Sequence, residues 1–446
     1  MSSKTLSLSY SSILMFALPM MVSGFIQSVV LITDSAFISR YSVIGFDAVG
    51  NAGLAYVTFF IMLMGMSDGA QIIMARRIGQ EQFSAVGQQV TAAGLVLIGL
   101  AAFFFTLLQT VVPTIIQGNA LSAEVAELQG VYLKYRSFGL FFAMITLLLQ
   151  ALYLAQGRTR LVLSAALITA GGNIVLDYLF IYGIGVFPEL GVAGAGLASA
   201  LADALGMSFL LAVTLVSRMN RPYELFQKKR NISAEVKALL KVGTPLMLQG
   251  FFALFTWTIF FVWIEQMGQF ELTVSQNIRS LYFLAFVPIW GFASTTKTYI
   301  SQYIGAGQQE SIPLIQRRIQ RLTLIFLLIF FHGAIIYPRA LISIINPHQE
   351  FLAESSAILQ LIIGSILIFG IVSVYFQTIL GSGNTVASMT IEIVSVTIYM
   401  VFAYLFIKVF KFDIYYVWTV EYIYFGTMGA LSLLYLYFFN WKQKKI

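Results

Sequence analysis

The sequence predicts an all-α integral membrane protein: twelve transmembrane helices in two parallel six-helix repeats around a central cleft. Three observations support this fold class, namely the scarcity of charge, the long apolar segments and an internal repeat. The chain has 446 residues, of which 59% are hydrophobic and only 10% are charged, whereas soluble domains carry roughly 25% charged residues. So few charges cannot cover a water-exposed surface of this size, and we expect most of the surface to face the lipid bilayer.

The apolar segments are long enough to cross a membrane as helices, which takes roughly 20 residues each. The predicted spans are residues 12–38, 50–75, 89–113, 136–155, 161–183, 191–217, 238–264, 278–303, 319–345, 354–380, 387–408 and 414–438. The N-terminal stretch lacks a small-residue cleavage site and continues directly into the first span. We therefore expect this helix to be retained and not removed as a signal peptide.

The basic residues predict the orientation, because Lys and Arg accumulate in cytoplasmic loops. With the N-terminus inside, the inner segments hold Lys4, Arg76, Arg77, Arg158, Arg160, Arg218, Arg221, Lys228, Lys229, Arg230, Lys237, Lys241, Arg317, Arg318, Arg321, Lys442, Lys444 and Lys445. The outer segments hold only Arg40, Lys134, Arg136, Arg279, Arg339, Lys408 and Lys411. We expect both termini in the cytoplasm and the protein in the plasma (inner) membrane. Membrane orientation also accounts for the net charge of +7, so no nucleic-acid partner is expected.

The chain matches itself at one fixed offset of 226 residues, from residue 19 to residue 181. Matched positions include Pro19 with Pro245, Gly24 with Gly250, Asn51 with Asn277, Gly65 with Gly291, and Tyr178-Leu-Phe-Ile with Tyr404-Leu-Phe-Ile. Six spans per repeat is an even number, so the two halves lie parallel, as in many transporters. We predict an N-terminal lobe of residues 1–217, a cytoplasmic linker of residues 218–237 and a C-terminal lobe of residues 238–446.

Polar residues of the N-terminal half predict a cation site, because ionisable groups at membrane depth are costly and usually functional. Asp34 and Asp177 lie at similar depth, Asn173 is one helical turn from Asp177, and Ser199 has comparable depth in the next span. Na⁺ prefers oxygen ligands of this kind, here Asp34, Asn173 and Asp177, and a buried carboxyl pair can also carry a proton. The alternative is a structural role, in which each acid hydrogen-bonds the backbone at a helix kink.

The repeat makes this cluster specific to one half. At the offset of 226, Asp34 corresponds to Phe260, Asn173 to Tyr399 and Asp177 to Ala403. A purely structural polar cluster would more easily have survived in both copies. The predicted coupling site therefore belongs to the N-terminal lobe.

Other ionisable residues lie within predicted spans. Lys297 and Glu392 have similar depth in the C-terminal half and are a candidate ion pair. Such a pair roughly breaks even in energy, so structural and substrate-binding roles stay equally open. Asp203 lies near mid-membrane and is a candidate cavity residue, whereas Glu421 carries little weight.

Several segments resemble the multidrug and toxic compound extrusion (MATE) family over nearly the whole chain. "ALPMMVSGFIQSVVLITDSAFISR" is similar to the first helix of that family, with its proline and later aspartate. "GNIVLDYLFIYGIGVFPELGVAGAGLASALA" is similar to the fifth and sixth helices, and "IGQEQ" and "IGAGQQ" to cytoplasmic turns. The resemblance implies a V-shaped pair of six-helix bundles that exports organic compounds in exchange for Na⁺ or H⁺.

The family pattern assigns the cation site to Asp34, Asn173 and Asp177, with Ser199 replacing a threonine of the pattern and keeping the hydroxyl. One branch of the family carries acids in helices seven and ten, where this chain reads "LMLQGFFALF" and "SVYFQTILGS" without a carboxylate. The resemblance therefore favours coupling in the N-terminal lobe.

The predicted function is a secondary active antiporter that exports organic, cationic or drug-like compounds in exchange for H⁺ or Na⁺. No P-loop, HExxH motif, Ser/His/Asp set or cysteine is present, so we expect neither an enzyme nor a bound cofactor, and we expect a monomer. The alternative is a flippase for lipids or lipid-linked glycans. It needs a basic cavity for phosphate, whereas only Lys297 lies clearly within a predicted span.

Overall fold

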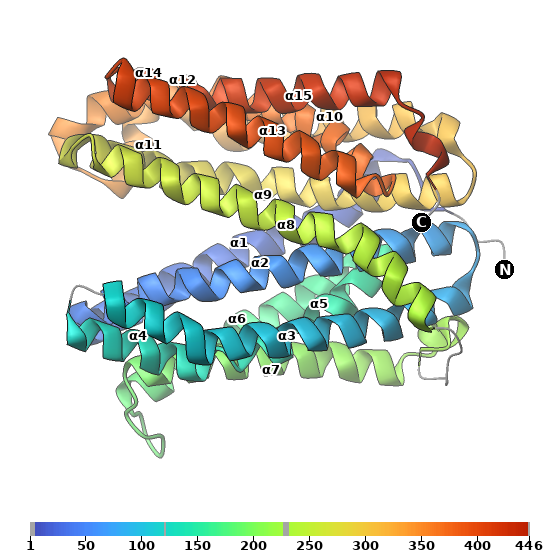
Figure 1. Ribbon diagram of the computed structural model, residues 1–446, viewed down its shortest axis with the longest axis horizontal. Helices are drawn as coiled ribbons and strands as arrows, with labels where there is room; N and C mark the ends of the chain where they lie inside the picture. Colours follow the sequence, from blue (N-terminus) through green and yellow to red (C-terminus); the bar gives the residue numbers. More distant parts are fainter. Residues whose placement is uncertain (1–4, 120–121, 226–231, 445–446) are drawn as a thin grey trace. The chain divides into compact units, whose positions relative to one another are not determined.

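The computed structural model describes residues 5–119, 122–225 and 232–444. Every regular element in this part of the chain is helical (Figure 1), which confirms the predicted all-α class. The longer helices are α1 (Tyr10–Tyr41), α2 (Val43–Gly79), α3 (Phe83–Asn119), α4 (Ala123–Arg136), α5 (Gly139–Ala155), α6 (Thr159–Tyr182), α7 (Val192–Val216), α8 (Ile232–Glu265), α9 (Gln269–Gly305), α10 (Ile312–Ile336), α11 (Pro338–Ile345), α12 (Gln349–Gly381), α13 (Thr385–Tyr404) and α15 (Val420–Phe438).

The helices are long and apolar enough to make a multi-pass membrane protein. Ten of the described helices are long and apolar enough to cross a membrane. The helices α4 and α5 meet at a bend of 45°, and an eleventh candidate results if the two form one span. The helix of the predicted twelfth span, α15, is not among them, since Glu421 and its tyrosines make it less apolar. Twelve helices in two repeats remain consistent with this arrangement.

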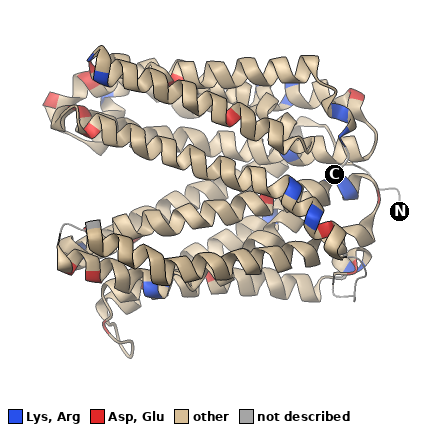
Figure 2. Ribbon diagram, in the orientation of Figure 1, with Lys and Arg blue, Asp and Glu red and all other residues tan. Residues whose placement is uncertain are grey.

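Charged residues lie mainly toward the ends of the helices, with few along their middle (Figure 2). This distribution is the one expected of spans whose central segments face hydrocarbon. Of the predicted inner charges, Lys4, Lys228, Lys229, Arg230 and Lys445 lie outside the described residues.

The chain packs as two compact units. The N-terminal unit is Val22–Met247, and the C-terminal unit combines Met1–Met21 with Leu248–Ile446. These bounds differ from the predicted lobes because α1 and α8 each divide between the units, and Val22 and Leu248 are themselves separated by the repeat offset. The lobe bounds stay a prediction.

Equivalent close contacts explain this division. A Cβ on Gly65 would lie 2.7 Å from the backbone of Met247, and a Cβ on Gly291 would lie 2.5 Å from Cγ of Met21. Glycine at both positions lets α2 pack directly on the first half of α8, and α9 on the first half of α1. The first half of each divided helix is therefore held by the opposite repeat.

Close helix packing also holds α7 in the N-terminal unit. A Cβ on Gly194 would lie 2.5 Å from the carbonyl oxygen of Phe180 in α6, and one on Gly196 would lie 2.7 Å from the carbonyl oxygen of Tyr132 in α4. The glycine-rich start of α7 is thus a packing surface of small residues. This contact sets the distance between the helices that carry Asn173, Asp177 and Ser199.

We expect Gly194→Ala to destabilise the protein by about 2 kcal/mol, because the added methyl group has no space beside a backbone oxygen. Gly171→Ala on α6 is the matched control, since nothing lies within 4 Å of its Cβ position. That change should be neutral or stabilise by up to about 1 kcal/mol through helix propensity. Thermal unfolding of the purified variants in detergent measures both, and equal stability of the two would contradict the packing argument.

Candidate cation site

The two predicted carboxylates meet inside the N-terminal unit. Asp34 lies in the second half of α1 and Asp177 near the end of α6, and their carboxyl groups are close enough to interact directly. Asp177 is fully buried, and Asn173, one turn earlier on the same face of α6, is 3% exposed. The structure thus brings together the two acids that the sequence places 143 positions apart.

Asn173 and Ser199 orient the polar face of this site. The amide nitrogen Nδ2 of Asn173 donates to Oγ of Ser199 on α7 at 3.3 Å. Its oxygen Oδ1 therefore remains available, and it accepts no hydrogen bond from the described residues. The same holds for both carboxyl oxygens of Asp177 and for Oδ1 of Asp34.

Unsatisfied oxygens of this kind are rare in folded proteins, because a buried acceptor without a donor costs about 1–3 kcal/mol, and more if it is charged. Here, four such oxygens come from three residues on two helices. A cation or a shared proton would satisfy them, since both supply positive charge to an oxygen-only ligand set. The geometry fits an ion-binding site, and Asp177 has no hydrogen-bond partner of its own among the described residues.

Arg136 is a further charged group of this site, although the sequence pattern counts it among the outer flanking charges at the start of the fourth predicted span. The predicted fourth span began at residue 136, but α4 starts at Ala123 and Arg136 lies at its end, at the bend to α5 inside one candidate span. Its charge acts on both Asp34 and Asp177. Besides Lys297, Arg136 is therefore also a cation within a candidate span of the described residues.

The bend that positions Arg136 is supported by a side chain of a neighbouring helix. Nε2 of Gln109 on α3 donates to the carbonyl oxygen of Lys134 at 3.0 Å and to Oγ of Ser137 at 2.8 Å. Both residues of the joint, Ser137 and Phe138, keep right-handed helical backbone angles. The span is therefore bent but not interrupted, and its polar joint is supported by a side chain of a neighbouring helix.

Asp203 forms an ion pair with Arg136. Nη1 of Arg136 lies 2.7 Å from Oδ2 of Asp203 on α7, and the guanidinium carbon lies 3.8 Å from the ring centroid of Tyr56 on α2. Gly139 makes room for this pair, because a Cβ there would lie 2.1 Å from Nη1 and 3.0 Å from Oδ2. The candidate cavity residue Asp203 is thus the partner of a cation beside the carboxyl pair.

In the C-terminal unit, the acids are held by tyrosines. Glu392 on α13 accepts a hydrogen bond from Tyr424 at 2.6 Å, so the partner that the structure shows for it is not Lys297. Glu421 accepts from Tyr282 and Tyr399 and is 1% exposed. Lys297 is buried on α9, and its ion pair with Glu392 stays a prediction.

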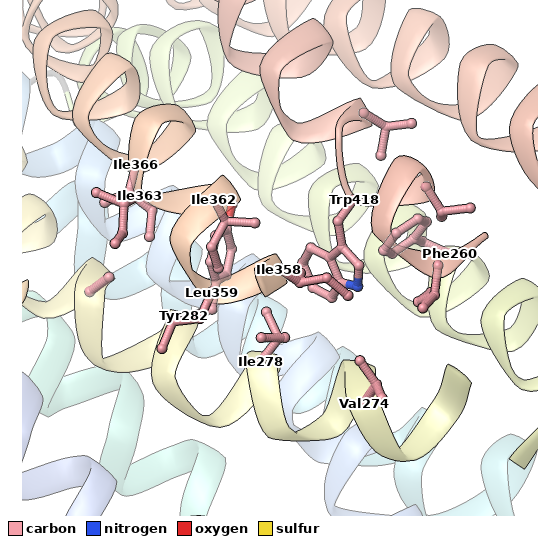
Figure 3. Close-up of a cluster of buried hydrophobic side chains, with 14 of the residues drawn as sticks. Phe260, Val274, Ile278, Tyr282, Ile358, Leu359, Ile362, Ile363, Ile366 and Trp418 are labelled. Atoms are coloured by element: carbon pink, nitrogen blue, oxygen red, sulfur yellow. The ribbon is translucent and has the colours of Figure 1, made fainter. Parts of the chain in front are cut away.

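The equivalent place in the second repeat is a hydrophobic core. Figure 3 shows Phe260, Ile362 and Tyr282 in this cluster. Phe260, Ile362, Tyr399 and Ala403, which belong to it, are the counterparts of Asp34, Arg136, Asn173 and Asp177 at the offset of 226. At these four positions, the same helical frame therefore holds charged or polar residues in one copy and apolar or aromatic side chains in the other.

The sequence profile of the MatE family matches residues 19–179 and again residues 245–405. The chain belongs to the MatE family. The two matched segments start 226 residues apart, which confirms the repeat that the sequence predicts. This MatE chain is therefore a multi-pass membrane transporter.

Known relatives and structures agree with this assignment. The probable multidrug resistance protein NorM of Thermotoga maritima is 26% identical over 439 residues, covering 96% of this chain and 92% of that protein. NorM of Halalkalibacterium halodurans is 28% identical over 290 residues, which are 63% of this chain and 61% of that protein.

Two solved structures share the fold. A MATE transporter of Vibrio cholerae superposes with a TM-score of 0.86 at 17% identity, covering 98% of each chain. A multidrug resistance MATE family transporter in an outward-facing conformation gives 0.85 at 19% identity, covering 97% of this chain and 95% of that one. Identities this low show the fold of the MatE chain and not its substrate.

We expect Asp177→Asn to leave the protein as stable as the wild type or to stabilise it by about 1–3 kcal/mol, because the carboxyl oxygens it removes have no donors. Glu421→Gln is the matched control and should lose about 1–3 kcal/mol, because it weakens two tyrosine hydrogen bonds. Thermal unfolding without Na⁺ at neutral pH tests both. A loss in Asp177→Asn equal to that in Glu421→Gln would show that Asp177 has a structural role.

Proposed function

We propose that the protein is a secondary active antiporter that exports organic, cationic or drug-like compounds in exchange for H⁺ or Na⁺. The observation that carries this proposal is the carboxyl pair of Asp34 and Asp177 within two candidate spans, in which Oδ1 of the half-buried Asp34 and both carboxyl oxygens of the fully buried Asp177 have no hydrogen-bond donor among the described residues. An inside-negative potential favours entry of the coupling ion by about 2.3 kcal/mol per charge per 100 mV.

Asp34 and Asp177 carry the charge of the coupling ion, and Asn173 and Ser199 complete its oxygen shell. Neutralising the pair removes the repulsion between α1 and α6, which changes how favourably these helices pack. The ion thereby stabilises one arrangement of the transporter over another, which is the requirement for alternating access.

The substrate class rests on the relatives, which are named probable multidrug resistance proteins. We propose small organic substrates for this chain, a monomeric state, and a place in the plasma membrane with both termini in the cytoplasm. The flippase alternative is less well supported, because the intramembrane Arg136 is neutralised by Asp203 and adds no net positive charge for a phosphate group.

Asp34→Asn and Asp177→Asn should each reduce ion-driven efflux of the organic cation ethidium from proteoliposomes to background, because the coupling ion loses its counter-charge. Asp47→Asn is the matched control, an exposed acid of the same unit on α2, and should transport like the wild type. Imposing a Na⁺ gradient and a pH gradient separately identifies the coupling ion. Full transport by either site variant would refute the assignment.

The orientation is testable because the chain contains no cysteine. Gln443→Cys near the C-terminus is exposed, and Val186→Cys lies in the turn between α6 and α7 with a wild-type side chain that is 94% exposed. On intact cells, a membrane-impermeant maleimide should label Val186→Cys but reach Gln443→Cys only after lysis. The reverse pattern would place both termini outside.

A further inference from the structure

We propose that Arg136 is a tethered cation of the coupling site, which pairs with Asp203 while the coupling ion is bound and turns to Asp34 and Asp177 when that ion leaves. This inference rests on the proposed function and adds to it a positioning residue. It also assigns a purpose to Asp203, which the exchange of ions alone does not require.

Arg136 is bonded to one acid, and its charge acts on two others. Its Nη1 is 2.7 Å from Oδ2 of Asp203 on α7. One turn before Asp203 on the same helix, Ser199 accepts the hydrogen bond of Asn173 in the cation site, where the Arg136 charge acts on Asp34 and Asp177. The side chain of Arg136 is 14% exposed, so the guanidinium group is largely removed from water. A short rotation of a long side chain therefore changes which acid it neutralises.

The charges of the cluster make such an exchange necessary. With Arg136 on Asp203, the carboxyl pair has no protein cation bonded to it and can hold the incoming ion. After the ion leaves, two ionised carboxylates would remain adjacent at membrane depth, which is costly. Arg136 is placed to offset that cost and allow the transporter to reset without a bound ion.

When Arg136 has turned to Asp34 and Asp177, Tyr56 replaces it as the hydrogen-bond partner of Asp203. Its hydroxyl group is buried and has no hydrogen-bond partner among the described residues. The hydroxyl and Oδ2 of Asp203 both lie within 3.1 Å of the point that a Cβ on Gly139 would occupy. Once Arg136 turns away, this hydroxyl is close to the carboxylate that needs a donor.

The second repeat supports a functional role for Arg136. Its counterpart Ile362 is fully buried in the hydrophobic cluster of Figure 3, where the counterparts of Asp34 and Asp177 also lie. The arginine is therefore present in the copy that has the carboxyl pair and replaced in the copy that lacks it. A helix-packing role alone would not require this coincidence.

The test measures ion binding directly, by the infrared bands of the carboxyl groups in nanodiscs, titrated with H⁺ and separately with Na⁺. The charged or titratable groups that act on the pair in this titration are Tyr132 and Arg136 on α4, and those that act on Arg136 in turn are Tyr56 on α2 and Asp203 on α7. The site signal is the part of the wild-type spectrum that Asp177→Asn removes. If the wild type shows no such signal, the proposed function fails and this inference fails with it.

If the wild type shows this signal, Arg136→Gln and Asp203→Asn should shift the ion concentration at which it titrates in opposite directions. Arg136→Gln removes a nearby positive charge, so the pair should bind its ion about tenfold more tightly. Asp203→Asn releases Arg136 toward the pair, so binding should weaken about tenfold. The double variant, which lacks both charges, should resemble Arg136→Gln, because Asp203 acts here only through Arg136.

The matched control is a second ion pair of the same unit, between Arg77 in the last turn of α2 and Glu235 on α8, whose side chains are 11% and 13% exposed. Arg77→Gln and Glu235→Gln should change thermal stability and leave ion binding unchanged. If Arg136→Gln and Asp203→Asn change the ion affinity in the same direction, or if neither changes it, their ion pair has only a structural role. If Arg136→Gln does not fold, Asp203→Asn keeps the proposal falsifiable, since release of Arg136 toward the pair must weaken ion binding, and unaltered binding would overturn the proposal.

Discussion

A carboxyl group inside a membrane protein must be neutralised, and the buried acids of this chain meet that constraint in three ways. Glu421 accepts hydrogen bonds from two tyrosines, and Asp203 is paired with Arg136. Asp177 has neither kind of partner among the described residues, although it is fully buried. The first two arrangements are complete within the protein, whereas the third has no donor among the described residues, and this difference is the basis on which we propose a coupling site.

Much of the fold was predictable from sequence, because the bilayer imposes a fixed span length and duplication leaves a fixed offset. The pairing of Asp34 with Asp177 was predictable as well, since the two acids have similar depth in the first and fifth spans of one half and both are lost in the second repeat. Depth does not specify the direction in which a side chain points around its helix. For that reason, it did not reveal that Glu392 bonds Tyr424.

Arg136 escaped prediction for a different reason. The helix that ends with it, "AEVAELQGVYLKYR", is polar enough to read as an outer loop, so its last residue was interpreted as a flanking charge. No proline marks the bend, and the residue that supports it, Gln109, belongs to another helix. Asp203 follows its partner by 67 positions, so no local pattern links them. A polar joint inside a span depends on tertiary contacts, which single-sequence patterns do not contain.

The bend itself belongs to the half of the chain that carries the carboxyl pair. The first-repeat span consists of α4 and α5, whereas the equivalent stretch of the second repeat is the continuous helix α12. The second repeat also lacks the amide that supports the bend and the arginine at its end, because Gln109 corresponds to Ile335 and Arg136 to Ile362. A joint with freed carbonyl groups is expensive in a membrane unless a donor serves it. The bend, its amide donor Gln109 and Arg136 therefore occur together, in the repeat that contains the carboxyl pair. We interpret them as one structural unit that places a movable charge beside that pair.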